Sequence, residues 1–106
     1  MPEPQPYAVI DIDGVLANVE HRLHHIERRP KDWARFFAAA SDDTVYVEGL
    51  AVARRLAQDH ELVYLSGRPE GLRRVTLDWF GRYDVPAGQV LLRRASDRRP
   101  AAQVKV

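Results

Sequence analysis

The sequence predicts an α/β protein with a three-layer, Rossmann-like parallel sheet and a short helical insertion after the first strand. Two observations support this fold class. Short apolar segments rich in β-branched residues alternate with segments of helical spacing, which is typical of parallel sheets with crossover helices on both faces. The 106 residues also suit one domain with one core. We therefore expect residues 1–106 to form a single domain.

Three segments are predicted to be strands. Residues 7–12 (YAVIDI) form a nearly continuous apolar run, as in a strand that is buried on both faces. Residues 61–65 (ELVYL) and 89–92 (QVLL) have the same apolar character. Residues 13–14 and 66–69 contain the Asp, Ser, Gly and Pro that are typical of turns, so we expect the first two strands to end there.

Helical spacing of apolar residues predicts helices over residues 48–60 and 70–83. A further helix is expected to begin at residues 98–100, because proline suits the first helical turn. The order is therefore strand, helical insertion, helix, strand, helix, strand and the start of a helix.

The insertion, residues 19–41, contains an aromatic cluster. Asp32 is placed to cap a helix in which Trp33, Phe36 and Phe37 share one face. Packing of these rings in the core is the favoured interpretation. Stacking on a nucleobase is the alternative.

Polar side chains stand at the carboxyl ends of the first two predicted strands. These residues are Asp11, Asp13, Ser66 and Arg68. In parallel α/β sheets, ligands bind in the crevice outside the carboxyl ends of the strands. We therefore expect a binding site at this edge of the sheet.

The pair Asp11 and Asp13 carries the first chemical prediction. Two carboxylates this close repel each other unless a cation lies between them, and oxygen ligands of this kind favour Mg²⁺. A turn aspartate is the alternative for either one alone. The segment Ser66, Gly67 and Arg68 offers a hydroxyl, free backbone N–H groups and a guanidinium, which together can hold phosphoryl oxygens. An ordinary turn is the alternative here.

These motifs resemble the haloacid-dehalogenase superfamily of phosphohydrolases. Asp11 and Asp13 match its Asp-x-Asp-Gly motif, Ser66 matches its second motif, and Lys105 matches its basic residue on a later helix. The chain resembles in particular the 3′-phosphatase domain of bacteriophage polynucleotide kinase and related bacterial acid phosphatases. Three features carry that likeness: Arg22, nine residues after Asp13, the unit Ser66-Gly67-Arg68, and the pair Val104-Lys105 after the third strand.

The resemblance implies a Mg²⁺-dependent phosphomonoester hydrolase, with nucleic-acid 3′ ends or nucleotides as substrates. Asp11 would be the nucleophile that forms an aspartyl-phosphate, and Asp13 the general acid and base. Ser66, Gly67, Arg68, Arg22 and Lys105 would bind the phosphate or the substrate. Asp11 and the backbone carbonyl of Asp13 would hold the metal.

The sequence departs from the superfamily at its carboxyl end. The fourth motif, an acidic cluster after the lysine helix, is absent because the chain ends one residue past Lys105. We therefore expect an incomplete domain with C-terminal strands missing and weak or no activity by itself. The alternative function is a catalytically incomplete domain that binds a phosphorylated ligand or a partner chain. An exposed edge on the first strand would also permit a homodimer.

The distribution of charge along the chain indicates which kinds of partner it could bind. Residues 1–67 carry 7 basic and 11 acidic side chains, and residues 68–106 carry 9 basic and 4 acidic ones. The basic second half favours an anionic partner, and pairs of arginines at 93–94 and 98–99 could follow a nucleic-acid backbone or simply flank a strand. No segment is apolar enough to span a membrane, so we expect no membrane partner.

The lack of cysteine excludes disulfide and zinc-thiolate sites and permits a cytoplasmic location. His21, His24 and His25 lie close together, but zinc usually needs further ligands. Dehalogenase chemistry is disfavoured because enzymes of that kind lack the second aspartate, which is Asp13 here.

Overall fold

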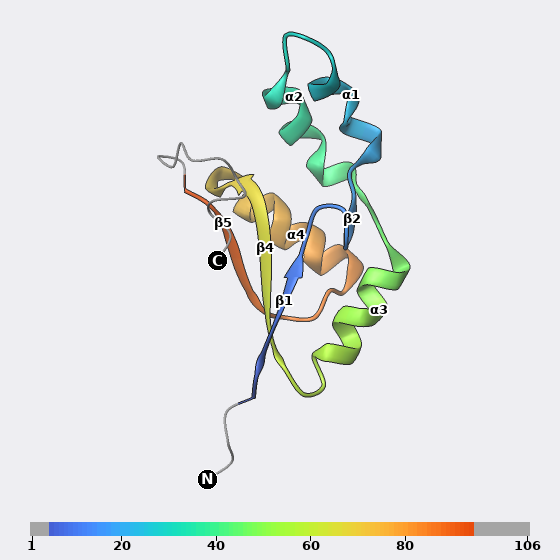
Figure 1. Ribbon diagram of the computed structural model, residues 1–106, viewed down its shortest axis with the longest axis vertical. Helices are drawn as coiled ribbons and strands as arrows, with labels where there is room; N and C mark the ends of the chain where they lie inside the picture. Colours follow the sequence, from blue (N-terminus) through green and yellow to red (C-terminus); the bar gives the residue numbers. More distant parts are fainter. Residues whose placement is uncertain (1–4, 95–106) are drawn as a thin grey trace.

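The structure is a computed structural model that describes residues 5–94. Its central feature is a parallel sheet of three strands in the order β1, β4, β5 (Figure 1). These strands are β1 (Tyr7–Asp11), β4 (Glu61–Pro69) and β5 (Gln89–Arg93). The α/β fold class and the three predicted strands are confirmed.

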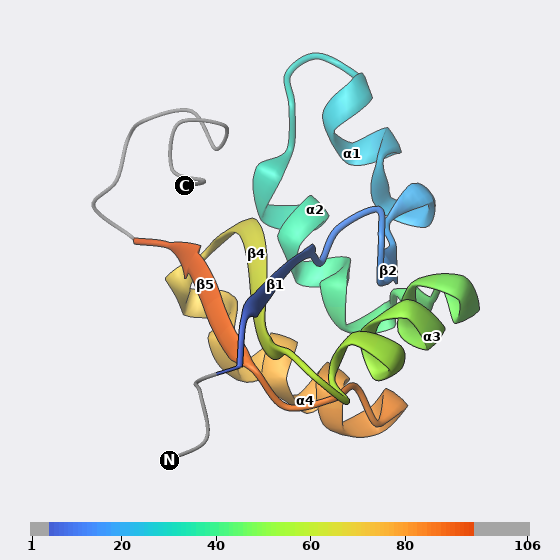
Figure 2. The same ribbon diagram turned by 60° about the horizontal axis from the view of Figure 1, so that its bottom comes forward.

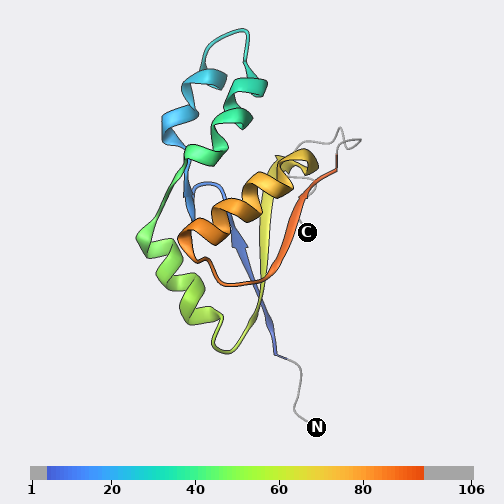
Figure 3. The same cartoon turned by 180° about the vertical axis from the view of Figure 1, so that it is seen from behind.

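Helices α3 (Val47–Leu56) and α4 (Arg73–Tyr83) connect the strands. Both connections move in the same direction across the sheet, from β1 to β4 and from β4 to β5. Because crossovers of this kind are right-handed, both helices cover the same face, and within residues 5–94 the two crossover helices do not lie on opposite faces as the expected three-layer arrangement requires. Figure 3 shows α4 lying along the strands on that face.

The hydrophobic core lies between this face and the two helices. Alternate residues of the strands point into it, together with an alanine of α3 and two aromatic residues of α4; the main members are Ile10, Ile12, Leu62, Tyr64, Val90, Leu92, Ala53, Trp79 and Phe80. This period of two places the core on one side of each strand.

The prediction that the first strand is buried on both faces is wrong for the part of the chain that the structure describes. Tyr7 and Val9 are 67% and 59% exposed, since α3 and α4 both lie on the opposite face. The helix expected from residue 98 lies outside the described residues. Strand β1 forms one edge of the described sheet, as predicted.

Strand β4 is longer than predicted. Its pairing with β5 is irregular between Leu65 and Pro69, and it continues through the segment that was expected to be a turn. Ser66 and Arg68 are therefore held in a buried strand rather than in a loop. A 3₁₀ turn, η3 (Glu70–Leu72), then leads into α4.

The predicted insertion forms a separate pair of short helices, α1 (His24–Glu27) and α2 (Trp33–Ala38). Two-residue strands β2 (Ala17–Asn18) and β3 (Thr44–Val45) pair antiparallel at its base. Two 3₁₀ turns, η1 (Glu20–Arg22) and η2 (Ala39–Asp42), complete it. Figure 2 shows α1 and α2 standing away from α3 and α4, beyond the end of β1.

The predicted cap of α2 is confirmed, because the side chain of Asp32 accepts a hydrogen bond from the backbone N–H of Arg35 at 3.0 Å. Helix α3 ends at Leu56, four residues before the predicted end. None of the helices within residues 5–94 is long and apolar enough to cross a bilayer.

Candidate active site

The turn after β1 places Asp13 at the edge of the sheet. Gly14 adopts a φ of 87°, a left-handed conformation that glycine adopts without steric cost. This allows the chain to reverse, and the N–H of Ala17 donates to the carbonyl of Ile12 at 2.9 Å. Asp11 ends β1 at this same edge and is exposed.

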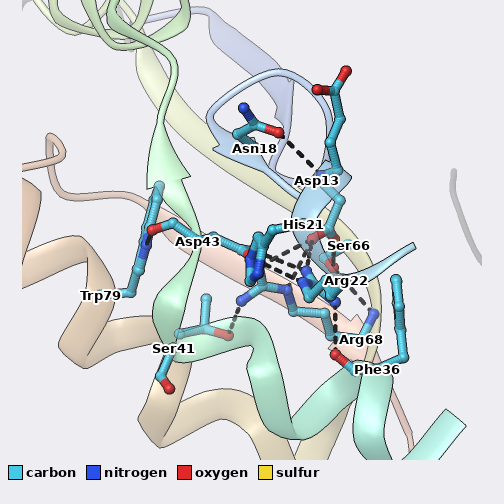
Figure 4. Close-up of polar contacts among 12 residues, drawn as sticks. Asp13, Asn18, His21, Arg22, Phe36, Ser41, Asp43, Ser66, Arg68 and Trp79 are labelled. Carbon is cyan, nitrogen blue, oxygen red and sulfur yellow. Dashed lines mark hydrogen bonds and ion pairs between the residues drawn. The ribbon is translucent and has the colours of Figure 1, made fainter. Parts of the chain in front are cut away.

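Three predicted residues converge on the carboxylate of Asp13 (Figure 4). The hydroxyl of Ser66 donates to Oδ2 at 2.5 Å. Oδ1 accepts from Nε of Arg68 at 3.0 Å and from Nη2 of Arg22 at 3.2 Å. The structure thus brings together residues that lie 9 to 55 positions apart in the sequence.

A second aspartate, Asp43, holds the same two arginines from the other side. Its carboxylate accepts from Nε and Nη2 of Arg22 at 2.7 and 2.9 Å and from Nη2 of Arg68 at 3.2 Å. Its backbone carbonyl accepts from the indole N–H of Trp79 at 2.8 Å. Asp43 has no exposed surface, so its charge is fully committed to these contacts.

Arg22 and Arg68 are both buried, although arginine side chains usually lie at the surface. Their exposed fractions are 1% and 2%. Arg68 also donates to the hydroxyl of Thr76 at 3.0 Å, and Arg22 to the carbonyl of Phe36 at 3.1 Å. Two carboxylates facing two guanidinium groups balance the charge, as buried ions require.

Asp43 is a site residue that was not predicted from the sequence. Residues 41–43 read as a polar segment with no motif. One signal was available: if Arg22 and Arg68 both belong to a buried site and Asp11 is assigned to the nucleophile and the metal, Asp13 alone leaves one guanidinium without a carboxylate partner. A second carboxylate close to the arginines was therefore required.

The three histidines of the insertion do not gather on one ligand. His21 shares a hydrogen bond with Oδ1 of Asp43 at 2.6 Å, whereas His24 and His25 pack ring against ring. Partial desolvation and the neighbouring His24 lower the pKa of His25. Within residues 5–94 no group of three or more His, Cys, Asp or Glu side chains is arranged to hold a metal.

A cavity of about 670 Å³ opens beside Asp13. Its polar lining comes from residues at the ends of the strands and from η1, and its apolar lining comes from α2; the lining residues are Asp13, Arg22, Gly67, Arg68, Arg93, Trp33, Phe36 and Phe37. Trp33 is 47% exposed, and none of the three rings belongs to the core cluster of the described residues. The favoured interpretation of the aromatics as core residues is therefore wrong.

Lys105, the remaining predicted phosphate ligand, lies outside the described residues, as does the arginine pair at 98–99. Arg93 contributes to the cavity wall, which places one member of the other arginine pair at the site.

The described residues at the carboxyl ends of the strands have side chains of the kind that bind Mg²⁺. Asp11 and Asp13 supply hard carboxylate oxygens at one sheet edge, and Mg²⁺ in phosphate-binding sites commonly uses one or two carboxylates together with water and substrate oxygens. The oxygens of Asp13 already accept from Ser66, Arg22 and Arg68.

The parallel sheet, the two strand-end aspartates and the serine at the next strand define an α/β protein of the haloacid-dehalogenase superfamily. The comparisons with known proteins are more specific. Residues 5–106 match the family model described as the polynucleotide kinase PNKP phosphatase domain. The chain belongs to this family.

Two solved structures are similar to the chain. One is titled "Structure of Pnkp1/Rnl/Hen1 complex", with 26% identity and a TM-score of 0.72 over 95% of this chain and 32% of that one. The other, "Structure of the Pnkp1/Rnl/Hen1 RNA repair complex", has 25% identity and a TM-score of 0.73 over 95% and 30%. The chain thus spans about a third of the length of these relatives. A search of curated proteins finds no match.

Proposed function

We propose that this chain is a phosphomonoester hydrolase domain that acts on phosphorylated nucleic-acid 3′ ends or on nucleotides. The observation that carries the proposal is the convergence of Ser66, Arg22 and Arg68 on Asp13, beside Asp11 and at the mouth of a cavity. Family membership supports the reaction class.

The proposed reaction has two steps. In the first, a carboxylate oxygen of Asp11 attacks phosphorus, the bond from phosphorus to the ester oxygen breaks, and Asp13 gives a proton to the departing oxygen. In the second, Asp13 takes a proton from a water molecule whose oxygen attacks phosphorus. The bond between phosphorus and Asp11 then breaks, which releases inorganic phosphate and restores both side chains.

The arginines and Ser66 position Asp13 and face the phosphoryl group. Because Arg22 and Arg68 are also held by Asp43, their guanidinium groups are preorganised, so little reorganisation is needed when charge develops on the phosphoryl oxygens. A Mg²⁺ ion held by Asp11 and the backbone carbonyl of Asp13 would add positive charge against the same oxygens.

The helical insertion over residues 19–41 is proposed to act as a small cap that helps to select the substrate. It carries Arg22 into the site and forms the apolar wall of the cavity with α2. The domain assignment, a single phosphatase domain with this insertion, is part of the same proposal.

Phosphate release tests the proposal. The substrates are an aryl phosphate and a short 3′-phosphorylated oligonucleotide, each with and without Mg²⁺. We expect metal-dependent release from the wild type and loss of release in Asp11→Asn. Asp59→Asn, at an exposed turn, is the matched control and should behave as the wild type.

The alternative is a domain that binds phosphorylated ligands without hydrolysing them. The three hydrogen bonds that Asp13 already accepts favour it, since they engage both carboxylate oxygens in the described structure. Phosphate binding by both the wild type and Asp11→Asn, without release by either, would support this alternative over catalysis.

A further inference from the structure

The aromatic cluster of Trp33, Phe36 and Phe37 has no role in the reaction proposed above and no place in the core. It belongs to the cavity that also contains Asp13 and the arginines. Three neighbouring aromatic rings that line a cavity and lie outside the core are typical of a surface that binds a ligand or a partner.

The rings are held in fixed relative positions. Trp33 lies edge-on to Phe36 with ring centroids 5.7 Å apart and is stacked on Phe37 with centroids 5.8 Å apart and planes 26° from parallel. Phe36 and Phe37 meet edge to face at 5.4 Å. These are favourable aromatic geometries, so the cluster is a preformed apolar surface.

Arg22 connects this surface to the proposed phosphate site. Its guanidinium carbon lies 4.3 Å from the ring centroid of Phe36, while Nη2 of the same side chain donates to Asp13. Since the Trp33 centroid is 5.7 Å from that of Phe36, the indole lies at most 10.0 Å from the guanidinium carbon. The phosphate site and the aromatic surface are thus neighbours within one cavity.

The charges around the indole suit a phosphorylated ligand. The ammonium group of Lys31 lies 5.7 Å from the ring centroid of Trp33, and Arg93 lines the same cavity. A ligand that reaches from Asp13 to Trp33 would therefore meet positive charge at its phosphate and a flat π surface beyond it.

We propose that Trp33, supported by Phe37, stacks on the nucleobase of the nucleotide whose phosphate occupies the Asp13 and Arg68 end of the cavity. The inference rests on the proposed function and names the part of the substrate that the insertion recognises. A nucleobase is planar and every base has a π face, so stacking gives affinity without a strong preference for base identity.

Binding measurements with a matched pair of ligands test the inference. The ligands are thymidine 3′-monophosphate and 1,2-dideoxyribose 3-phosphate, which is the same compound without the base. Titration calorimetry is carried out on the full chain with Asp11→Asn in every variant, so that the ester stays intact. Trp33→Ala removes the surface, and Trp33→Phe restores a smaller one. Arg35→Ala, on the same helix with its side chain 77% exposed, is the matched control.

Base stacking measured by alanine substitution predicts a loss of affinity of about 5- to 150-fold for the nucleotide in Trp33→Ala. Trp33→Phe should recover part of that loss, and Arg35→Ala should change nothing. The base-free ligand should bind all variants equally, which also shows that the Trp33→Ala chain is folded.

Three results would overturn the inference. Equal affinity of the parent for the two ligands would exclude a contribution from the base. An equal loss for both ligands in Trp33→Ala would assign the tryptophan to structure. If the parent binds neither phosphorylated ligand, the proposed function fails together with the inference, whereas the first two results leave the proposed function standing.

Discussion

Replacement of Asp43 by asparagine tests whether the carboxylate of Asp43 compensates the charge of the two buried arginines. The substitution keeps the shape of the side chain but removes its charge. Either orientation of the amide turns an NH₂ group toward a guanidinium donor, because both carboxylate oxygens accept from arginine. With the NH₂ group at the Oδ1 position the bond from Nε of Arg22 would be lost, and at the Oδ2 position the bonds from Nη2 of Arg22 and Nη2 of Arg68 would be lost.

The expected magnitude follows from these contacts. A hydrogen bond to a charged group contributes about 1.5–3 kcal/mol, so the loss of one or two of them corresponds to roughly 1.5–6 kcal/mol. This agrees with the about 3–5 kcal/mol observed when one partner of a buried ion pair is removed. Small domains have a free energy of unfolding of about 5–15 kcal/mol, so Asp43→Asn should lose a large part of it.

Urea denaturation gives the measurement. Tryptophan fluorescence, measured with Trp33→Phe in every variant so that Trp79 is the single tryptophan, is a local probe, because the indole N–H of Trp79 donates to the backbone carbonyl of Asp43. Circular dichroism provides a global one. Asp42→Asn is the matched control, since Asp42 is exposed on the adjacent turn and should change the free energy of unfolding by less than about 0.5 kcal/mol. A loss below about 1 kcal/mol in Asp43→Asn, with an unchanged slope, would refute the argument that Asp43 compensates the buried arginines.

Four further perturbations, one of pH and three by substitution, should change the free energy of unfolding by smaller amounts. Burial raises the pKa of Tyr64 to about 12, so the unfolded chain loses this proton first. The free energy of unfolding should fall as pH rises from about 10 to about 12, by up to about 3 kcal/mol. Tyr64→Phe should remove that dependence in urea titrations across this range. A Cβ at Gly49 would lie 2.0 Å from the carbonyl oxygen of Val15, so Gly49→Ala should cost about 1–3 kcal/mol or more by overpacking. Gly81→Ala meets no neighbouring atom and should stabilise helix α4 by about 0.5–1 kcal/mol; calorimetric melting of the two variants measures both, and equal melting temperatures would contradict the prediction. Asp32→Ala removes the cap of α2 and should lose about 1 kcal/mol, visible as a lower urea midpoint.

The sequence was sufficient to predict the strands and the polar residues at their ends. The reason is geometric: parallel strands bring their carboxyl ends to one edge, so residues as distant as Asp13 and Ser66 are placed together as soon as both strands are recognised. The face of the sheet that each helix covers was harder to predict. It depends on the direction of each crossover, and the apolar pattern of residues 7–12 contains no information about direction.

The role of Asp43 and the position of the aromatic cluster could not be predicted from the sequence, for a different reason. A carboxylate between two short elements has no periodicity, and only the three-dimensional path of η2 and β3 brings it to Arg22 and Arg68. For Trp33, Phe36 and Phe37, helical spacing correctly placed the rings on one face. Spacing alone does not specify what covers that face, so core and ligand surface give the same pattern.

Arg22 is the residue in which these two parts of the site meet. One guanidinium contacts Asp13, Asp43 and the ring of Phe36, so a substitution at Arg22 would disturb the proposed phosphate site and the aromatic surface together. Arg68 contacts both aspartates and Thr76. Comparison of Arg68→Lys with Trp33→Ala therefore separates the two functions: the first should weaken binding of both phosphorylated ligands, and the second should weaken only the ligand that carries a base.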